Sequence, residues 1–380
     1  MKGIKQCFYF LRSSALWLLF IGTVICYILA FASAYLPPKT WWCLSLLGFG
    51  FPILMVVLVV LLPIMWWRKR QKTTIFGLLV LLASYPIASK VVATSFFNKN
   101  TTGAFTVLSF NVARFGYKQH FNIAFPPNRE TIVNTIGTFK SDIMCLQEFW
   151  YIDSLNHRYN HLAYIKDSMH YPYYMFTNDF TWSGGGSLYG GNIIFSKYPI
   201  VKTAQEKLYS IGKTEDIGIA DIKINNDTFR IITYHLRSNK LNPNEVKTMD
   251  GVNENKILEN KTATLNLGKN ILNKLRSGAI DRAMQAQVLH KVIKQSPYPV
   301  ICTGDFNDIP NSYSYRIASQ GLQDAFLTKG TGWGRTFKSI SPTLRIDYTM
   351  YSPALICNSF MRYNFDQSDH YALQSSFTKK

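Results

Sequence analysis

The first hundred residues of this chain contain ten Lys and Arg but no Asp or Glu, and three long apolar stretches fill them. The uncharged stretches are 13–36, 40–67 and 74–89, and the third continues past Lys90 to Phe97. A helix needs about 20 apolar residues to cross the roughly 30 Å hydrocarbon core of a bilayer. We therefore predict an N-terminal region, residues 1–97, with transmembrane helices at about 13–36, 40–67 and 74–97. The third helix requires the Lys90 ammonium to reach the membrane interface.

The basic residues that flank these stretches predict their orientation. Three precede the first stretch, one lies between the first two, and four lie between the second and third: Lys2, Lys5, Arg12; Lys39; Arg68, Lys69, Arg70, Lys72. By the positive-inside rule, the N-terminus and the second loop stay in the cytoplasm. Three spans then place the rest of the chain on the periplasmic or extracellular side of the inner (cytoplasmic) membrane. A cleaved signal peptide is the alternative for the first stretch, but its apolar run is long and its cleavage pattern is weak.

The strong positive charge does not by itself indicate nucleic-acid binding. Of the formal net charge of +19, residues 1–100 contribute +10 and residues 101–380 contribute +9. About half of the excess is therefore the flanking charge of the membrane region rather than a basic recognition surface.

The cysteines show no metal-ligand spacing. Three of them, Cys145, Cys302 and Cys357, lie in the soluble part. Because three is an odd number, a full disulfide framework is excluded, and we expect packed free thiols.

Residues 104–380 show short strand patterns with a few helices between them, after a polar linker at 98–103. We expect strands at 104–112, 142–148, 190–196, 217–224 and 229–235, four more near the end, helices at 128–140 and 267–295, and an insertion loop at 241–266. Asn225-Asn226-Asp227 marks a β-hairpin. Strict alternation of strand and helix is missing, which argues against a parallel doubly wound sheet. The pattern predicts two packed sheets flanked by helices.

Eight polar residues stand in this part, most of them at the end of an apolar run. They are Asn111, Glu148, His235, Asp305, Asn307, Asp347, Asp369 and His370. Carboxylate and amide oxygens suit Mg²⁺, Mn²⁺ or Ca²⁺ rather than zinc. Imidazoles shuttle protons near neutral pH, and Asp347 is the candidate partner that fixes the tautomer of His370. The set therefore has the groups that a hard divalent cation and a phosphate ester require.

Each position has a simpler explanation when it is taken alone. Asp305 and Asn307 fit an Asx-rich turn. Glu148 fits a salt bridge to Arg114, and a single histidine is more often a satisfied core or surface residue. Independent explanations of this kind for eight positions are improbable, so the set favours a catalytic site.

In this order the residues resemble the endonuclease/exonuclease/phosphatase superfamily, which has the deoxyribonuclease-I-like fold. The resemblance covers about residues 104–378 and rests on Phe110-Asn111, Leu146-Gln147-Glu148, 191–199, Tyr234-His235-Leu236, 304–308, 345–348 and Ser368-Asp369-His370. It implies an α/β (α+β) four-layered sandwich, with two mixed or antiparallel sheets flanked by helices. It also implies a metal-dependent hydrolase of phosphate esters.

The resemblance assigns metal ligands to three matching residues. Glu148 is the main ligand, helped by Asn111 and Asp369. The ion is Mg²⁺ or Mn²⁺, with Ca²⁺ as a further candidate. One metal and two metals are both compatible with these residues.

The resemblance assigns catalytic roles to the other five. Asp305 and Asn307 position or activate the attacking water and bind the scissile phosphate. His235 and His370 flank the phosphate as acid, base or charge stabiliser, and Asp347 orients His370. Which histidine is the acid stays open.

Histidine at position 235 narrows the subfamily, because abasic-site endonucleases of this superfamily usually carry tyrosine there. It is similar instead to the secreted deoxyribonuclease, sphingomyelinase and phosphatase branches. We expect a membrane-anchored phosphodiesterase, nuclease or phosphatase with an extracytoplasmic catalytic domain at residues 104–380.

The expected partners are the lipid bilayer and a phosphate-ester substrate, either a lipid phosphodiester or nucleic acid, and no protein partner is implied. Arg282, Arg335 and Arg345 are candidate phosphate clamps, with plain surface charge as the alternative. The competing function is a catalytically silent, membrane-tethered binding module on the same fold. A transporter is disfavoured because three spans are few for a transport path.

Overall fold

The computed structural model describes residues 2–95, 100–116, 129–153, 160–183, 187–209, 215–241 and 261–380. Its N-terminal helices are α1 (Lys2–Ala32), α2 (Pro38–Phe49), α3 (Phe51–Trp67), α4 (Gln71–Ala83) and α5 (Tyr85–Val91). The helices of the following domain are α6 (Arg129–Thr138), α7 (His161–Ala163), α10 (Lys261–Lys294), α11 (Tyr313–Ala318) and α12 (Ala325–Lys329), with short turns η1 (Ala113–Gly116) and η2 (Tyr164–Ser168).

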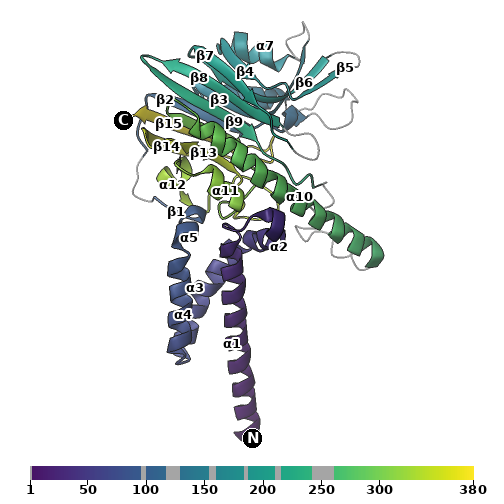
Figure 1. Ribbon diagram of the computed structural model, residues 1–380, viewed down its shortest axis with the longest axis vertical. Helices are drawn as coiled ribbons and strands as arrows, with labels where there is room; N and C mark the ends of the chain where they lie inside the picture. Colours follow the sequence, from purple (N-terminus) through teal and green to yellow (C-terminus); the bar gives the residue numbers. More distant parts are fainter. Residues whose placement is uncertain are drawn as a thin grey trace.

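Two β-sheets form the centre of the domain (Figure 1). One has seven strands: β14 (Leu355–Tyr363), β15 (Ala372–Lys379), β2 (Phe105–Asn111), β3 (Ile143–Asp153), β6 (Ser187–Ser196) and β4 (Tyr173–Phe176) in order, with β5 (Phe180–Ser183) also on β6. The other has six: β11 (Gln323–Asp324), β13 (Asp347–Tyr351), β10 (Val300–Asp305), β9 (Asp227–His235), β8 (Glu215–Ile224) and β7 (Ile200–Glu206). The pairs β2–β3 and β9–β10 are parallel and the other described pairs are antiparallel, so both sheets are mixed.

Apolar side chains between the layers hold the sandwich together. The facing sides of the two sheets share one core, which includes Val107, Ile143, Ile194, Ile222, Ile231 and Ile301. Helices α10 and α11 cover the outer face of the six-stranded sheet through Leu289 and Tyr315. Helix α6 covers the outer face of the seven-stranded sheet through Ile132 and Ile136. The predicted α/β sandwich with two mixed sheets is confirmed.

The cysteine prediction also holds in the described residues. Cys145, Cys302 and Cys357 are buried free thiols. The predicted hairpin is present as β8 and β9, with Ile224 opposite Asp227.

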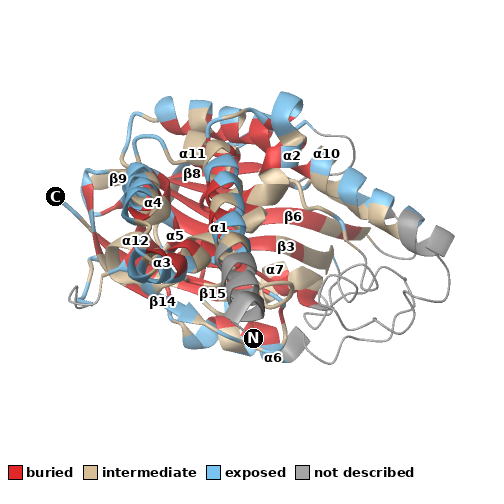
Figure 2. Ribbon diagram, turned by 90° about the horizontal axis from the view of Figure 1, so that it is seen from below, coloured by how far each residue is buried: buried red, intermediate tan, exposed pale blue. Residues whose placement is uncertain are grey.

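Helices α1, α3 and α4 stand side by side below the domain (Figure 1). Seen from below, α3 and α4 carry many exposed residues (Figure 2). Among the described residues, one helix segment, Ser14–Ala32, is long and apolar enough by itself to cross a membrane. The count rises to three if α2 with α3, bent by 55°, and α4 with α5, bent by 66°, each form one span.

The boundaries of the predicted spans are corrected by the structure. The first helix ends at Ala32 rather than residue 36, the second stretch breaks at Gly50, and the third breaks at Ser84. Pro52 and Pro86 stand at the start of α3 and α5, where a proline is tolerated because the first helical N–H groups have no partner. A proline therefore starts a new helix at each break. The third helix ends at Val91, and residues 96–97 of the predicted span lie outside the described residues.

The N-terminal region is joined to the domain rather than merely preceding it. Strand β1 (Ala93–Thr94) pairs with β12 (Thr331–Gly332) of the domain. Three buried or half-buried side chains of the domain also donate to backbone carbonyls of the N-terminal region. These are Arg316 to Ala34 at 2.7 Å, Asn311 to Gly48 at 2.9 Å and Arg345 to Lys90 at 2.7 Å.

The predicted insertion loop needs correction, whereas the described residues of the predicted linker have no regular secondary structure. Of the linker at 98–103, residues 98 and 99 lie outside the described residues, and the Thr101 N–H donates to the Asn358 carbonyl of β14. Of the loop at 241–266, residues 242–260 lie outside the described residues, and Lys261 to Asn266 already belong to α10. This first turn and a half was missed because its polar residues give no apolar periodicity.

Smaller differences concern element ends. Helix α6 begins at Arg129 and ends at Thr138, and residue 128 lies outside the described residues. Strand β3 continues five residues beyond Glu148, to Asp153. After α10 the four expected strands are β10, β13, β14 and β15, and the two-residue strands β11 and β12 were not expected.

We predict that Arg345→Leu destabilises the protein strongly. Arg345 and Asp324 are both buried, and their side chains are 2.6 Å apart. Removing the guanidinium leaves a buried carboxylate without its cation, which costs about 3–5 kcal/mol of unfolding free energy. Chemical denaturation of the full chain in detergent, followed by tryptophan fluorescence, measures the change.

The matched control is Lys379→Leu, because Lys379 and Asp227 form a half-exposed pair on the surface. Loss of such a pair costs less than about 1 kcal/mol. Adding Asp324→Asn to Arg345→Leu restores part of the stability, since the uncompensated charge is gone. Equal, small effects of Arg345→Leu and Lys379→Leu would contradict this account of the junction.

Candidate active site

Strand register brings three predicted site residues into one row at the end of the six-stranded sheet. Strands β9 and β10 are parallel, and their last residues, His235 and Asp305, are paired. Asp305 is also paired with Asp347, the first residue of the antiparallel strand β13. The three residues are neighbours because the parallel strands β9 and β10 end at the edge where β13 begins.

The seven-stranded sheet brings three more to the same edge. Asn111 ends β2 and is paired with Gln147 of the parallel strand β3, next to Glu148. His370 lies two residues before β15, which runs antiparallel to β2 and pairs Leu373 with Ser109. The ends of the two sheets therefore face each other through their polar residues.

Gly304 is required for the close approach of β9 and β10 at this edge. Its φ is +154°, and an added Cβ atom would overlap the carbonyl oxygen of Tyr234 on the neighbouring strand. Glycine is the residue without that atom. Its place directly before Asp305 sets where the carboxylate leaves the strand.

Several residues at the site have left-handed backbone conformations. Arg114 has a φ of 57°, Glu148 of 50° and Asn307 of 54°. Such angles are uncommon for residues other than glycine, and they persist where the surrounding structure holds them. At Glu148 the register with β6 shifts between Leu146 and Phe149, so a bulge redirects the carboxylate within a continuous strand.

Asp305 is the residue around which the others gather. One of its oxygens accepts a hydrogen bond from Asn111 at 3.1 Å and lies 3.5 Å from His235 Nε2 and 3.6 Å from His370 Nε2. The other accepts from the Asn307 N–H at 2.9 Å. The side chain is almost fully buried, and this burial raises the pKa of Asp305 to about 6 against the opposing effect of the His370 charge.

His370 and Asp347 form a buried pair. The Nδ1 atom of His370 lies 3.1 Å and 3.0 Å from the two Asp347 oxygens, so it carries the proton and donates it to this carboxylate. Burial alone lowers the pKa of His370, but the carboxylates of Asp347 and Asp305 outweigh it and hold the pKa well above its ordinary value. The imidazole is therefore fixed in orientation, with Nε2 toward Asp305.

Two hydroxyl residues that hold this pair were not singled out from the sequence. Ser368 donates to the Asn111 carbonyl at 2.8 Å and accepts from the His370 N–H at 3.1 Å. Thr336 accepts from the Asp347 N–H at 3.0 Å. Ser368 lies within a quoted motif, but nothing in the sequence distinguishes Thr336 from other hydroxyl residues.

Glu148 lies at the other side of the site and is paired with Arg114. The Arg114 Nε atom is 2.8 Å from one oxygen of Glu148, and His235 Nε2 is 4.0 Å from the other. The salt bridge considered as the simpler explanation of Glu148 is thus present. The Arg114 guanidinium also lies over the Trp150 ring, 5.0 Å from its centre.

The remaining predicted residues lie at the rim. Asn307 donates its side-chain amide to the Leu236 carbonyl at 3.1 Å. Asp369 is more than half exposed, and one of its oxygens is 4.0 Å from His370 Nε2. The structure therefore brings all eight residues into one continuous set around Asp305.

Two groups of side chains in this set have donors for a divalent cation. In the first, one ligand atom each from Asp305, Asp347 and His370 lie within 4.8 Å of one another. However, His370 Nδ1 is already hydrogen-bonded to Asp347, and a cation held by Nδ1 would have to break that pair. The second group is Glu148 with the amide oxygen of Asn111, which accepts from the Ala113 N–H at 3.0 Å and keeps a second lone pair. Both donors of this group are oxygens, which suit a hard cation better than a group that includes an imidazole.

Two of the predicted phosphate clamps are wrong. Arg282 and Arg345 are each 1% exposed and are paired with Asp308 and Asp324. Neither is among the described residues that line the cavity at the site. Arg335 donates from Nε to the Phe337 carbonyl at 2.7 Å, and it is not among the described residues that line the cavity.

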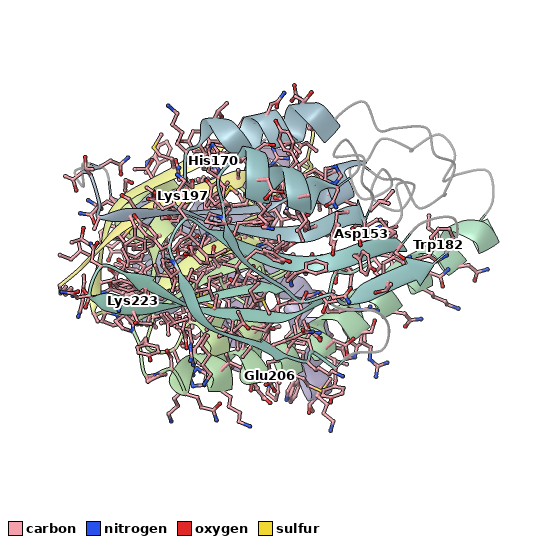
Figure 3. The ribbon with its side chains drawn as sticks, turned by 90° about the horizontal axis from the view of Figure 1, so that it is seen from above. Asp153, His170, Trp182, Lys197, Glu206 and Lys223 are labelled. Atoms are coloured by element: carbon pink, nitrogen blue, oxygen red, sulfur yellow. The ribbon has the colours of Figure 1, made fainter. Side chains whose placement is uncertain are left out.

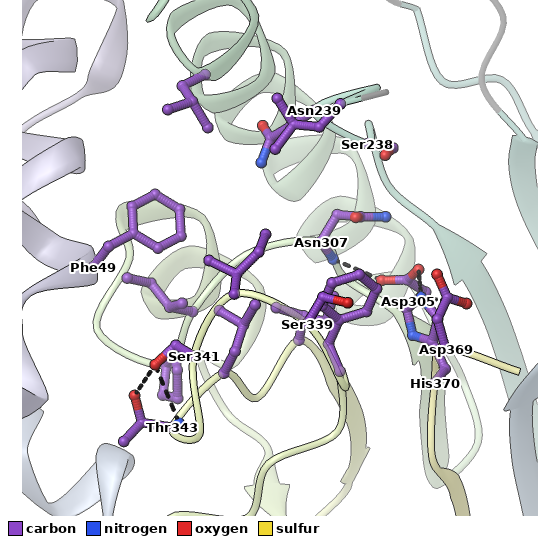
Figure 4. Close-up of a pocket in the computed structure, with 18 of the residues that line it drawn as sticks. Phe49, Ser238, Asn239, Asp305, Asn307, Ser339, Ser341, Thr343, Asp369 and His370 are labelled. Carbon is purple, nitrogen blue, oxygen red and sulfur yellow. Dashed lines mark hydrogen bonds and ion pairs between the residues drawn. The ribbon is translucent and has the colours of Figure 1, made fainter. Parts of the chain in front are cut away.

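A cavity of about 770 Å³ opens over the edge where the ends of the two sheets meet. Glu148, His235, Asp305, Asn307, Asp369 and His370 line one end of it. Figure 4 shows Asp305 and His370 at one end and Phe49 of α2 at the other. No sequence signal linked the N-terminal region to the site, because its apolar residues serve a membrane span equally well.

Comparison with known proteins identifies the domain. The model of the Endonuclease/Exonuclease/phosphatase family matches residues 108–370, and the model of a domain of unknown function matches residues 13–91. No curated protein matches the chain.

Several solved structures are similar to this chain at low identity. They include a family member from Bacteroides vulgatus (16% identity, 73% of this chain and 99% of that chain, TM-score 0.47) and the human Nocturnin catalytic domain with bound sulfate (17%, 74% and 97%, TM-score 0.46). A mannosyl-6-phosphatase from Bacteroides thetaiotaomicron is also similar (16%, 72% and 99%, TM-score 0.41).

The family model covers more than two thirds of the chain and spans all eight site residues. The chain therefore belongs to the endonuclease/exonuclease/phosphatase family, whose members are phosphoesterase and nuclease hydrolases that generally use a divalent metal.

Proposed function

We propose that this protein is a membrane-anchored, divalent-metal-dependent hydrolase of phosphate esters, of the phosphodiesterase, nuclease or phosphatase type. The observation that carries the proposal is the convergence of eight polar residues around the buried carboxylate of Asp305. Hydrolysis of a phosphate ester needs an oriented water, a proton acceptor, and positive charge near the phosphate oxygens. The side chains at this edge supply each of these.

The attacking water is placed and deprotonated by Asp305. Its pKa of about 6 lets it accept a proton near neutral pH. Water oxygen forms the new bond to phosphorus, its proton passes to the carboxylate, and the bond from phosphorus to the leaving oxygen breaks. Asn307 keeps one amide hydrogen free of Leu236 to donate to a phosphate oxygen.

The two histidines flank the phosphate. His370, held charged and oriented by Asp347, stabilises negative charge that develops on the phosphate oxygens or protonates the leaving oxygen. His235 lies on the other side of the same Asp305 oxygen and within 4.0 Å of Glu148. The two imidazoles therefore divide the acid and charge-stabilising roles between them.

The metal ion is Mg²⁺ or Mn²⁺, with Ca²⁺ as an alternative. Glu148 is its main ligand, and Asn111 and Asp369 assist. When bound, the ion supplies Lewis acidity toward the phosphate oxygens. Arg114 is paired with one Glu148 oxygen, and the other oxygen is the one that faces His235.

We further propose that α1, α3 and α4 cross the membrane. All three helices carry exposed large apolar side chains, including Leu19, Ile53, Val60, Leu79 and Leu82. Such side chains are more stable in contact with lipid than with water. At about 1.5 Å per residue the 17-residue α3 is about 25 Å long, close to the thickness of a hydrocarbon core. The 13-residue α4 is about 20 Å long, so its span also needs residues of α5 beyond the bend at Ser84, whereas α2 lies at the interface beside the domain.

The ends of these helices support an extracytoplasmic domain. The N-terminus and the α3–α4 connection lie at the end of the bundle away from the domain (Figure 1). Basic residues are concentrated in both: Lys2, Lys5 and Arg12, and Arg68, Lys69, Arg70 and Lys72. The positive-inside rule assigns this end to the cytoplasm and the domain to the periplasmic or extracellular side of the inner membrane.

We predict that the full chain in detergent hydrolyses bis(p-nitrophenyl) phosphate or p-nitrophenyl phosphate with Mg²⁺ or Mn²⁺ and loses the activity in EDTA. His370→Ala and Asp305→Asn lower kcat by about 10²- to 10⁴-fold, because each removes a proton-transfer or charge-stabilising group. His170→Ala serves as the control, since His170 is exposed on the surface of the domain (Figure 3). Equal activities of all variants, or no activity with intact metal binding, would favour a silent binding module instead.

We predict that a cysteine introduced at exposed Lys223 reacts with a membrane-impermeant maleimide in intact cells, after replacement of the native cysteines. A cysteine at Arg70 should react only after the membrane is opened. The labelling pattern follows from the proposed side of the domain. The reverse pattern would contradict the orientation, and labelling of both sites in intact cells would contradict the spans.

A further inference from the structure

We propose that the substrate is a membrane lipid with a phosphate-ester headgroup. Its hydrocarbon chain lies in the apolar end of the catalytic cavity, which we call the arm. This inference rests on the proposed function and adds the class of substrate. The cavity joins the catalytic edge directly to the N-terminal helices. Residues from three of those helices line it: Leu46 and Phe49 of α2, Pro52 of α3 and Val91 of α5.

The wall between the two ends is apolar. Ile309, Leu344 and Ile346 form a buried cluster, against which Phe49, Phe337 and Ile340 pack from α2 and from the loop before β13. All six line the cavity. Figure 4 shows further apolar side chains between Phe49 and the polar residues at Asp305. An alkyl chain placed there leaves water and contacts carbon on several sides.

Most polar groups along the arm are uncharged hydroxyls and amides, the amides being those of Asn239 and Asn311. Ser339, Ser341 and Thr343 line it, and the Ser341 and Thr343 hydroxyls are 3.0 Å apart. Lys240 is the only Lys or Arg among the described lining residues. A polynucleotide binds largely through cations placed along its phosphates, so this arm is a poor fit for one. It fits a ligand with one charged end and one long apolar end.

Helix α2 is held against the domain by specific contacts, so the arm is a fixed part of the structure. The Asn311 side-chain amide donates to the Gly48 carbonyl at 2.9 Å, in the last turn of α2. Arg276 of α10 lies over the Trp42 ring, 5.5 Å from its centre. Since α2 and α3, bent by 55° at Gly50, both line the arm, the arm lies beside the point where the proposed span leaves the membrane.

The test uses two chromogenic phosphodiesters, hexadecyl p-nitrophenyl phosphate and butyl p-nitrophenyl phosphate, with the full chain in detergent micelles. In each reaction water displaces p-nitrophenolate from phosphorus, so the chemistry is the same and the alkyl chain differs. We expect kcat/KM to be at least on the order of tenfold higher for the hexadecyl ester, because more methylene groups are buried. Phe49→Gln and Leu46→Gln should each lower the hexadecyl-to-butyl ratio toward one.

Val201→Gln is the matched control, because Val201 is exposed on β7, on the opposite sheet edge from the arm. It should leave the ratio unchanged. A ratio near one in the unsubstituted chain, or a ratio that neither Phe49→Gln nor Leu46→Gln changes, overturns the lipid inference but leaves the proposed hydrolase. Faster cleavage of a single-stranded oligonucleotide than of the hexadecyl ester also overturns it. Hydrolysis of none of these substrates overturns the proposed function and the lipid inference together.

Discussion

The buried carboxylate of Asp305 is the constraint on which the site depends. A charge at this depth costs several kcal/mol unless partners surround it. The structure meets that cost with two imidazoles, the Asn111 amide and the Asn307 backbone N–H, all within 3.6 Å of a carboxylate oxygen. Because those partners come from both sheets, the same contacts that stabilise Asp305 also bring the catalytic edge of each sheet together. The geometry needed for hydrolysis is therefore also the geometry that makes the buried charge tolerable.

The junction between the N-terminal helices and the domain obeys a similar rule. Arg345 is a buried cation that bridges Asp324 and the Lys90 carbonyl, and Asn311 is buried on the Gly48 carbonyl. Each of these side chains thus binds a backbone carbonyl near the end of an N-terminal helix. As a result α2 becomes one wall of the cavity that begins at the catalytic residues. The N-terminal helices are therefore part of the wall of the cavity at the candidate site.

Much of this arrangement could be predicted from the sequence, and the failures have physical causes. The run of short strand patterns with helices between them predicted the sandwich. Polar residues at strand ends, in an order that resembles the family, indicated the eight residues that the structure brings together. The bends at Gly50 and Ser84 were missed, since hydropathy reports composition and not the break that Pro52 and Pro86 introduce. Arg282 and Arg345 were misassigned because the sequence does not show whether an arginine pairs with a buried carboxylate in the folded chain. Thr336 and Phe49 could not be found, as their roles arise only from contacts between distant segments.

The proposed binding of a divalent cation at Glu148, beside Asp305, can be tested by locating Mn²⁺ in crystals of the protein. Anomalous diffraction from crystals of the full chain grown with Mn²⁺ should show a peak about 2.0–2.6 Å from a Glu148 oxygen, on the side that faces His235. The Glu148→Gln variant should lose that peak while the pair of His370 and Asp347 stays intact. A peak between His370 Nδ1 and Asp347, or the absence of any peak at the catalytic edge, would contradict the account.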